Sequence, residues 1–229
     1  MILLQDIIPS TYHFQPSWVM VLIVLSVMII GYLFSAFHSR FNAVVKAFFA
    51  TRFANELARE EYSLTHPVSV FLSVNFLLTC SLFILQLISS DTVFASVSEM
   101  NFISFLLVIL CVVVVCLVKI LSLKILGFVF DKLHVVAEYT FSIFLVNHIL
   151  GIGLIPIIIF IAYGKQSFES VFIYAGIALM AIAFCIRVGK GAISALTSGE
   201  VTLFYLFLYL CTLEILPLLL GFKLIEKLV

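Results

Sequence analysis

FISFLLVILCVVVVCLV, residues Phe102–Val118, decides the fold, because it contains no charged side chain and Ser104 is its single hydroxyl residue. An α-helix rises about 1.5 Å per residue and the hydrocarbon core of a bilayer is about 30 Å thick, so roughly 20 mostly apolar residues cross it. Strands of a membrane barrel alternate apolar and polar residues, and Ile109–Val118 shows no such alternation. The stretch is therefore typical of a transmembrane helix.

The whole chain of 229 residues shares this character, with 64% hydrophobic and 10% charged residues. Soluble domains are about 45–50% apolar and about 25% charged. We therefore predict an all-α polytopic transmembrane bundle that forms a single integral membrane domain over residues 1–229. The six predicted spans are Trp18–Phe37, Val68–Ile88, Phe102–Val118, Tyr139–Tyr163, Phe168–Ile186 and Val201–Phe222.

The distribution of Lys and Arg predicts the orientation of the spans, since positively charged loops tend to stay in the cytoplasm. The connectors after the first, third and fifth spans hold nine of the 12 cations, and the opposite side holds Lys165, Lys223 and Lys227. Both termini are therefore expected outside the cytoplasm. The first span is not expected to be a removable signal peptide, because residues 1–17 lack Lys and Arg.

Several classes of function lack a signature in the sequence. The 12 cations balance 12 anions, so no net charge favours binding of nucleic acid. The cysteines fall inside predicted spans and show no CxxC spacing, so neither a metal site nor a disulfide framework is indicated. No HExxH, GxSxG or GxxxxGK motif is present, and no cofactor is expected.

The connector from His38 to Pro67 is long enough to form structure of its own. On a helical wheel its apolar residues gather on one side, which predicts a helix lying along the cytoplasmic membrane surface. The predicted membrane contacts are Phe41, Val45, Lys46, Phe48 and Arg52. One alternative is an extension of the first span that packs against a neighbouring helix, and another is a surface that docks a protein.

Glu214 is the only acidic residue well inside a predicted span, where a charge near the bilayer centre costs about 2.5–3.5 kcal/mol. It should therefore face protein. Pro217 cannot donate to the carbonyl of Leu213, which leaves an acceptor for a neighbouring group. Two interpretations stay open: Glu214 is a neutral, hydrogen-bonded residue that fixes a kinked helix, or it is a protonatable group or a contact with a partner.

A second polar position lies on the fourth span, where Asn147 and His148 share a stripe that we expect to face the bundle interior. Pro156 interrupts the hydrogen-bond ladder of this span. Counted from the cytoplasmic ends of their spans, His148 and Glu214 lie about 14 and 20 Å deep. We therefore predict an interior polar cluster, whose members are Glu214, His148 and Asn147, with Asn75 or Gln86 of the second span as further candidates.

Two segments carry a resemblance to a known family, FYLFLYLCTLEILP at Phe204–Pro217 and YTFSIFLVNHILGIGLIP at Tyr139–Pro156. They resemble a family of small six-span bacterial inner-membrane proteins catalogued as a domain of unknown function. The resemblance implies a multi-pass protein of the bacterial inner membrane, and the distribution of Lys and Arg described above then predicts both termini in the periplasm. It implies no activity, cofactor or catalytic residue.

These observations favour a non-catalytic accessory or scaffold subunit that acts through other membrane or envelope proteins, or through a second copy of the chain. The alternative is a transporter of small solutes or protons that uses Glu214 and His148. A lipid-modifying enzyme would need an acid, a base and a nucleophile converging at one membrane interface. The remaining expected partner is the lipid bilayer itself.

Overall fold

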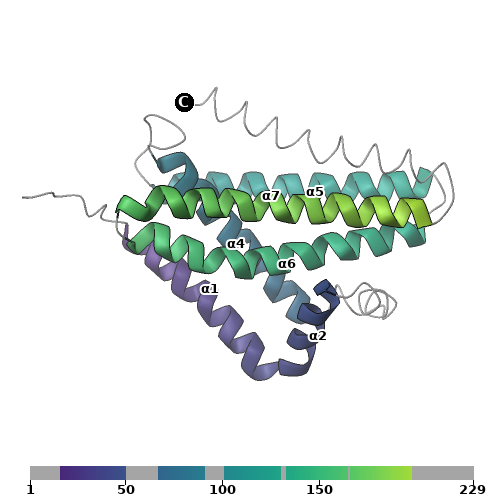
Figure 1. Cartoon of the computed structure of the whole chain (residues 1–229), viewed down its shortest axis with the longest axis horizontal. Helices are drawn as coiled ribbons and strands as arrows, with labels where there is room; N and C mark the ends of the chain where they lie inside the picture. Colours follow the sequence, from purple (N-terminus) through teal and green to yellow (C-terminus); the bar gives the residue numbers. More distant parts are fainter. Residues whose placement is uncertain (1–15, 50–66, 91–100, 130–132, 165, 198–229) are drawn as a thin grey trace, which may run out of the picture.

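The computed structural model describes residues 16–49, 67–90, 101–129, 133–164 and 166–197. In these ranges the chain forms six α-helices and no strand (Figure 1). Five of them, α1, α4, α5, α6 and α7, are long and apolar enough to cross a bilayer. The predicted all-α membrane bundle is therefore confirmed, while the predicted sixth span, 201–222, lies outside the described residues.

The first two helices, α1 (Ser17–Ala36) and α2 (His38–Phe49), are separated by a single residue. The carbonyl of Pro16 accepts a bond from the N–H of Val19 at 2.9 Å, which opens α1. Phe37 leaves the helical conformation, with φ −131° and ψ 40°, while its N–H still donates to Leu33 O at 3.0 Å. α2 is thus a separate helix directly after the first span, as the sequence predicts.

The other helices are α4 (Pro67–Ser89), α5 (Phe102–Val129), α6 (Leu133–Tyr163) and α7 (Gln166–Thr197). α4 begins at a proline, which suits a first turn because no N–H is needed there. The last three helices are longer than the predicted spans: α5 continues after Val118, α6 begins before Tyr139, and α7 continues after Ile186. A helix satisfies its own backbone bonds in water as well as in lipid, so hydropathy alone does not mark where it ends.

α4 and α6 form the centre of the bundle. α4 contacts α1, α5 and α6, and α7 packs along α6. Figure 1 shows α2, the start of α6 and the end of α7 toward one end of the molecule, and the start of α1 and the end of α6 at the opposite end. Successive spans therefore run in alternating directions.

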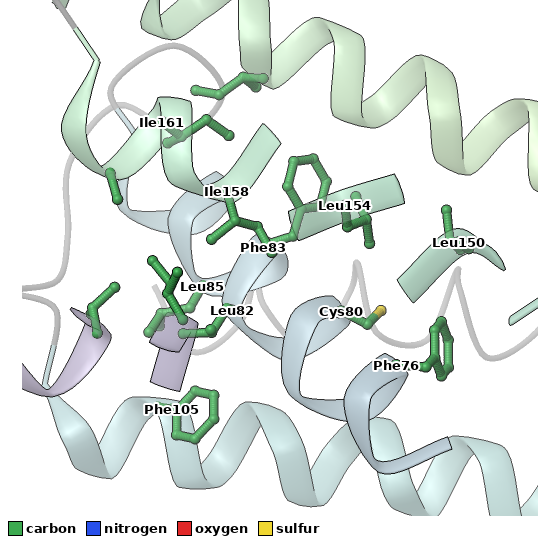
Figure 2. Close-up of a cluster of buried hydrophobic side chains, with 14 of the residues drawn as sticks. Phe76, Cys80, Leu82, Phe83, Leu85, Phe105, Leu150, Leu154, Ile158 and Ile161 are labelled. Carbon is green, nitrogen blue, oxygen red and sulfur yellow. The ribbon is translucent and has the colours of Figure 1, made fainter. Parts of the chain in front are cut away.

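Large apolar side chains fill the interface between the two central helices. Figure 2 shows Phe76, Cys80 and Phe83 of α4 near Leu154 and Ile158 of α6. Gly151 lets α6 come close to α4, and Gly176 does the same for α7. A Cβ at Gly151 would lie 2.8 Å from the Phe76 Cα, and one at Gly176 of α7 would lie 2.3 Å from the Phe83 ring.

Positively charged side chains mark one end of this bundle. The described Lys and Arg side chains belong to α2, to the last part of α5 and to the last part of α7, and they are Arg40, Lys46, Lys119, Lys124, Arg187 and Lys190. We call this the cationic end. At the opposite end, Trp18 of α1 packs on Phe102 and Phe105 of α5, with ring centroids 5.7 and 5.6 Å apart.

Candidate functional site

Buried polar side chains line α4, the most enclosed of the spans. Ser69, Ser73, Asn75, Thr79, Ser81 and Gln86 lie on this helix, and all but the half-buried Ser73 are buried. Polar groups inside a bilayer need partners within the protein, since lipid tails offer none. The partners of these side chains therefore show which helices the interior polar groups connect.

His148 of α6 faces α4 and is 3% exposed. Its Nε2 lies 3.0 Å from Ser73 Oγ, and that hydroxyl also donates to the Ser69 carbonyl at 2.8 Å. A hydroxyl has one proton to give, so both bonds form together when Nε2 carries the imidazole proton and donates it to Ser73. The pair joins α4 to α6 at the cationic half of the bundle.

Asn147, the neighbour of His148 in sequence, turns to a different helix. Its Oδ1 accepts a hydrogen bond from a guanidinium nitrogen of Arg187 on α7, which is half-buried. Adjacent helical residues point about 100° apart, so the two side chains reach opposite neighbours. Asn147 therefore joins α6 to α7 while His148 joins α6 to α4.

Two further bonds connect the central helix to its neighbours. Ser26 of α1 donates to Asn75 Oδ1 at 2.5 Å, and Gln86 Nε2 donates to the Ile158 carbonyl of α6 at 3.3 Å. Asn75 and Gln86, the additional candidates for the predicted cluster, are thus engaged by other residues. Together the four contacts connect α1, α4, α6 and α7.

The remaining predicted site residues, including the two prolines, have different outcomes. Glu214 and Pro217 lie outside the described residues, so the grouping of Glu214 with His148 and Asn147 stays a prediction. Pro156 lies within α6, on its exposed side, and the helix continues on both sides of it. Among the described residues, no group of three or more His, Cys, Asp or Glu side chains is placed to hold a metal ion.

The predicted membrane-surface residues lie on α2, apart from Arg52, which is outside the described residues. Phe41 packs beside Leu33, Val68 and Leu72, and Phe48 packs beside Ala47, Phe141 and Leu145. Val45 is half-buried and Lys46 is exposed. These contacts agree with the packing against neighbouring helices in the alternative of an extended first span, although α2 is a separate helix and not an extension of α1. Direct contact of α2 with lipid stays a prediction.

Lys190 of α7 also binds α2. Its Nζ donates to the Phe48 carbonyl at 3.5 Å and lies 5.3 Å from the centroid of the Phe48 ring. A lysine over an aromatic face gains roughly 0.5–1 kcal/mol at an exposed site. Arg187 and Lys190 appear in the sequence as topological cations of the fifth connector, and their partners, Asn147 and Phe48, come from segments far away in the chain.

A comparison with protein families matches residues 19–225 to the family described as Domain of unknown function (DUF4271). The chain belongs to this family. The resemblance drawn from the fourth and sixth predicted spans is therefore confirmed. No curated protein and no solved structure matches the chain in the corresponding searches.

The family match covers all the described helices except the first two residues of α1. The residues that form the four interhelical contacts, and all of α2, therefore lie within the matched range. The multi-pass membrane character of this member rests on its five long apolar helices.

Proposed function

We propose that this member of the DUF4271 family is a non-catalytic accessory subunit of the bacterial inner membrane, which acts through other membrane or envelope proteins. The observation that carries the proposal is the distribution of its polar groups. Inside the bundle several of them bond one helix to another, as Ser26 does with Asn75 and Ser73 with His148. Such bonds fix one arrangement of the spans, which suits a scaffold.

The cationic end supplies the surface that a partner's segment outside the membrane would contact. Lys46 on α2 and Lys124 on α5 are exposed there. Since cationic connectors tend to stay in the cytoplasm, we infer that this end is cytoplasmic and that both termini are periplasmic. A partner with an acidic cytoplasmic segment would be complementary to it.

Recovery of a stoichiometric partner tests this proposal. The tagged chain is crosslinked in its native cells, purified in mild detergent and analysed by mass spectrometry. We expect a membrane or envelope protein in constant ratio to the chain, and a loss of at least fivefold in the variant that combines Lys46→Glu and Lys124→Glu. The matched variant with Lys46→Arg and Lys124→Arg keeps the charges and should keep the partner. Recovery of the chain without any stoichiometric protein contradicts the proposal.

Transport of protons or small solutes is the second candidate. It is favoured by two ionisable side chains: His148 of α6, and Arg187 of α7, which donates to Asn147, the neighbour of His148 in the sequence. Proteoliposomes with an imposed pH gradient test it, using His148→Gln and Glu214→Gln to remove ionisation while keeping similar shapes. Faster dissipation of the gradient by the wild-type chain than by both variants would support transport, and equal rates with protein-free liposomes would exclude proton movement.

A further inference from the structure

An open groove runs between α1 and α6, with a volume of about 540 Å³. Its lining is apolar apart from one phenol, and consists of Met20, Ile23, Val24, Val27, Met28, Ile159 and Tyr163. α1 contributes residues 20–28 and α6 its last turns, so the groove lies in the half of the bundle opposite the cationic end (Figure 1). We propose that this groove binds one acyl chain of a membrane phospholipid from the leaflet at that end.

The length of the groove fits one leaflet. Met20 and Met28 are eight residues apart on α1, which corresponds to about 12 Å along the helix. Half of a bilayer core of about 30 Å is about 15 Å, the depth that one acyl chain occupies. A transmembrane helix of a partner would cross both leaflets, whereas the groove extends over only about half of α1.

The size of the groove also favours a lipid over a protein. A stable protein interface uses about 20–30 residues from each side, whereas this groove is formed by the seven side chains named above. Its volume lies within the range of roughly 300–1,000 Å³ that is typical of sites for small molecules. Met20 and Met28 are flexible and polarisable, which suits a chain of variable conformation.

The mouth of the groove lies where a phospholipid carries its polar part. Tyr163 is the last residue of α6 and is 53% exposed. Tyr and Trp prefer the headgroup region, and Trp18 lies near the start of α1 at the same end of the bundle. A bound lipid would therefore place its ester and phosphate groups near the Tyr163 hydroxyl and its tail along Val24 and Val27.

Two substitutions on one helix test the proposal. Val24→Phe fills the groove, whereas Val21→Phe adds the same ring at an exposed position of α1 that does not line it. Each chain is reconstituted in phosphatidylcholine nanodiscs, extracted and washed repeatedly in mild detergent, and weighed by native mass spectrometry. We expect about one retained phosphatidylcholine per chain for the wild type and for Val21→Phe, and at least fivefold less for Val24→Phe. Equal retention by the two variants, or no retention by the wild type, overturns the proposal.

A measurement on the unaltered chain keeps the test independent of how the variants fold. Phosphatidylcholine with a photoreactive diazirine in its acyl chain is crosslinked to the wild-type protein in nanodiscs, and the labelled residues are mapped by mass spectrometry. We expect labels concentrated on Met20, Val24, Val27 and Ile159. Uniform labelling of exposed α1 residues, including Val21 and Leu25, would identify ordinary lipid contact. Protection of the groove by the segment 201–222 or by a protein partner would likewise overturn the proposal.

Discussion

At Gly151, α6 comes close to the backbone of α4. A Cβ there would lie 2.8 Å from the Phe76 Cα and 3.2 Å from the Phe76 nitrogen. Backbone atoms inside a packed bundle cannot move aside as a flexible side chain can. Small residues at such crossings let membrane helices pack closely.

We therefore expect Gly151→Val to destabilise the bundle by about 1–3 kcal/mol, the usual cost of overpacking. Gly31→Val is the matched control, because Gly31 lies inside α1 and a Cβ there meets no atom within 4 Å. The two chains are compared by their free energies of unfolding in a titration with sodium dodecyl sulfate. Equal losses in both variants would show that Gly151 does not mark a close crossing.

The bond between Ser73 and His148 should contribute a measurable coupling energy. Hydrogen bonds between membrane helices average about 0.6 kcal/mol in double-mutant cycles, with a maximum of about 1.7 kcal/mol. We expect a value in this range from unfolding free energies of Ser73→Ala, His148→Ala and the double variant. Asn147 bonds to Arg187, so a cycle between Ser73 and Asn147 should give a coupling close to zero. Equal couplings in both cycles would contradict the assignment.

The same residues show how far the sequence predicts the candidate site. Helical spacing correctly indicates that His148 faces the interior of the bundle, since a polar residue inside a span avoids lipid. Spacing alone does not reveal that Asn147 and His148 bind different helices, because that depends on which neighbours flank α6. The sequence signal for the bond between Arg187 and Asn147 was the position of Arg187 at the end of an apolar run. A cation at such a position is equally explained by the tendency of positive residues to stay on the cytoplasmic side.

At the scale of the elements, α2 is held to the bundle by a small interface. Ala47 is fully buried against Phe141 and Leu145 of α6, and Lys190 of α7 binds the Phe48 carbonyl. The apolar face of α2 was predictable from its spacing. The surface that it covers was not, because lipid and an apolar helix attract such a face for the same physical reason.

We expect Ala47→Leu to release α2, since there is no space for a larger side chain at a fully buried alanine. If the larger side chain costs about 1.4 kcal/mol, the equilibrium between docked and released α2 shifts tenfold. Amide hydrogen exchange in nanodiscs should therefore become about tenfold faster in α2 and stay unchanged in α4. Ala36→Leu, at an exposed position at the end of α1, should leave both helices unaffected. Unchanged exchange in α2 of the Ala47 variant would mean that this helix is held in another way.

At the scale of the whole molecule, composition predicts the class of protein, and the positions of the apolar stretches predict the approximate places of the five described spans. It does not predict their packing order. The central place of α4 follows from its buried polar side chains, which need protein partners on several sides, whereas α5 presents mostly apolar side chains that lipid can cover. This difference between the two helices was visible in the sequence, because the second span contains Asn75 and Gln86. The mean hydropathy of a whole span conceals such single polar residues.

The gathering of cations at one end predicts the orientation of the whole bundle. In a chain whose native cysteines are replaced by alanine, we introduce Lys124→Cys at the cationic end or Tyr163→Cys at the opposite end, both at exposed positions. A membrane-impermeant maleimide should label Tyr163→Cys from the periplasmic side. It should label Lys124→Cys only after the membrane is permeabilised, because cationic segments resist translocation. The reverse pattern would place the cationic end in the periplasm, and would also move the proposed acyl-chain groove from the periplasmic to the cytoplasmic leaflet.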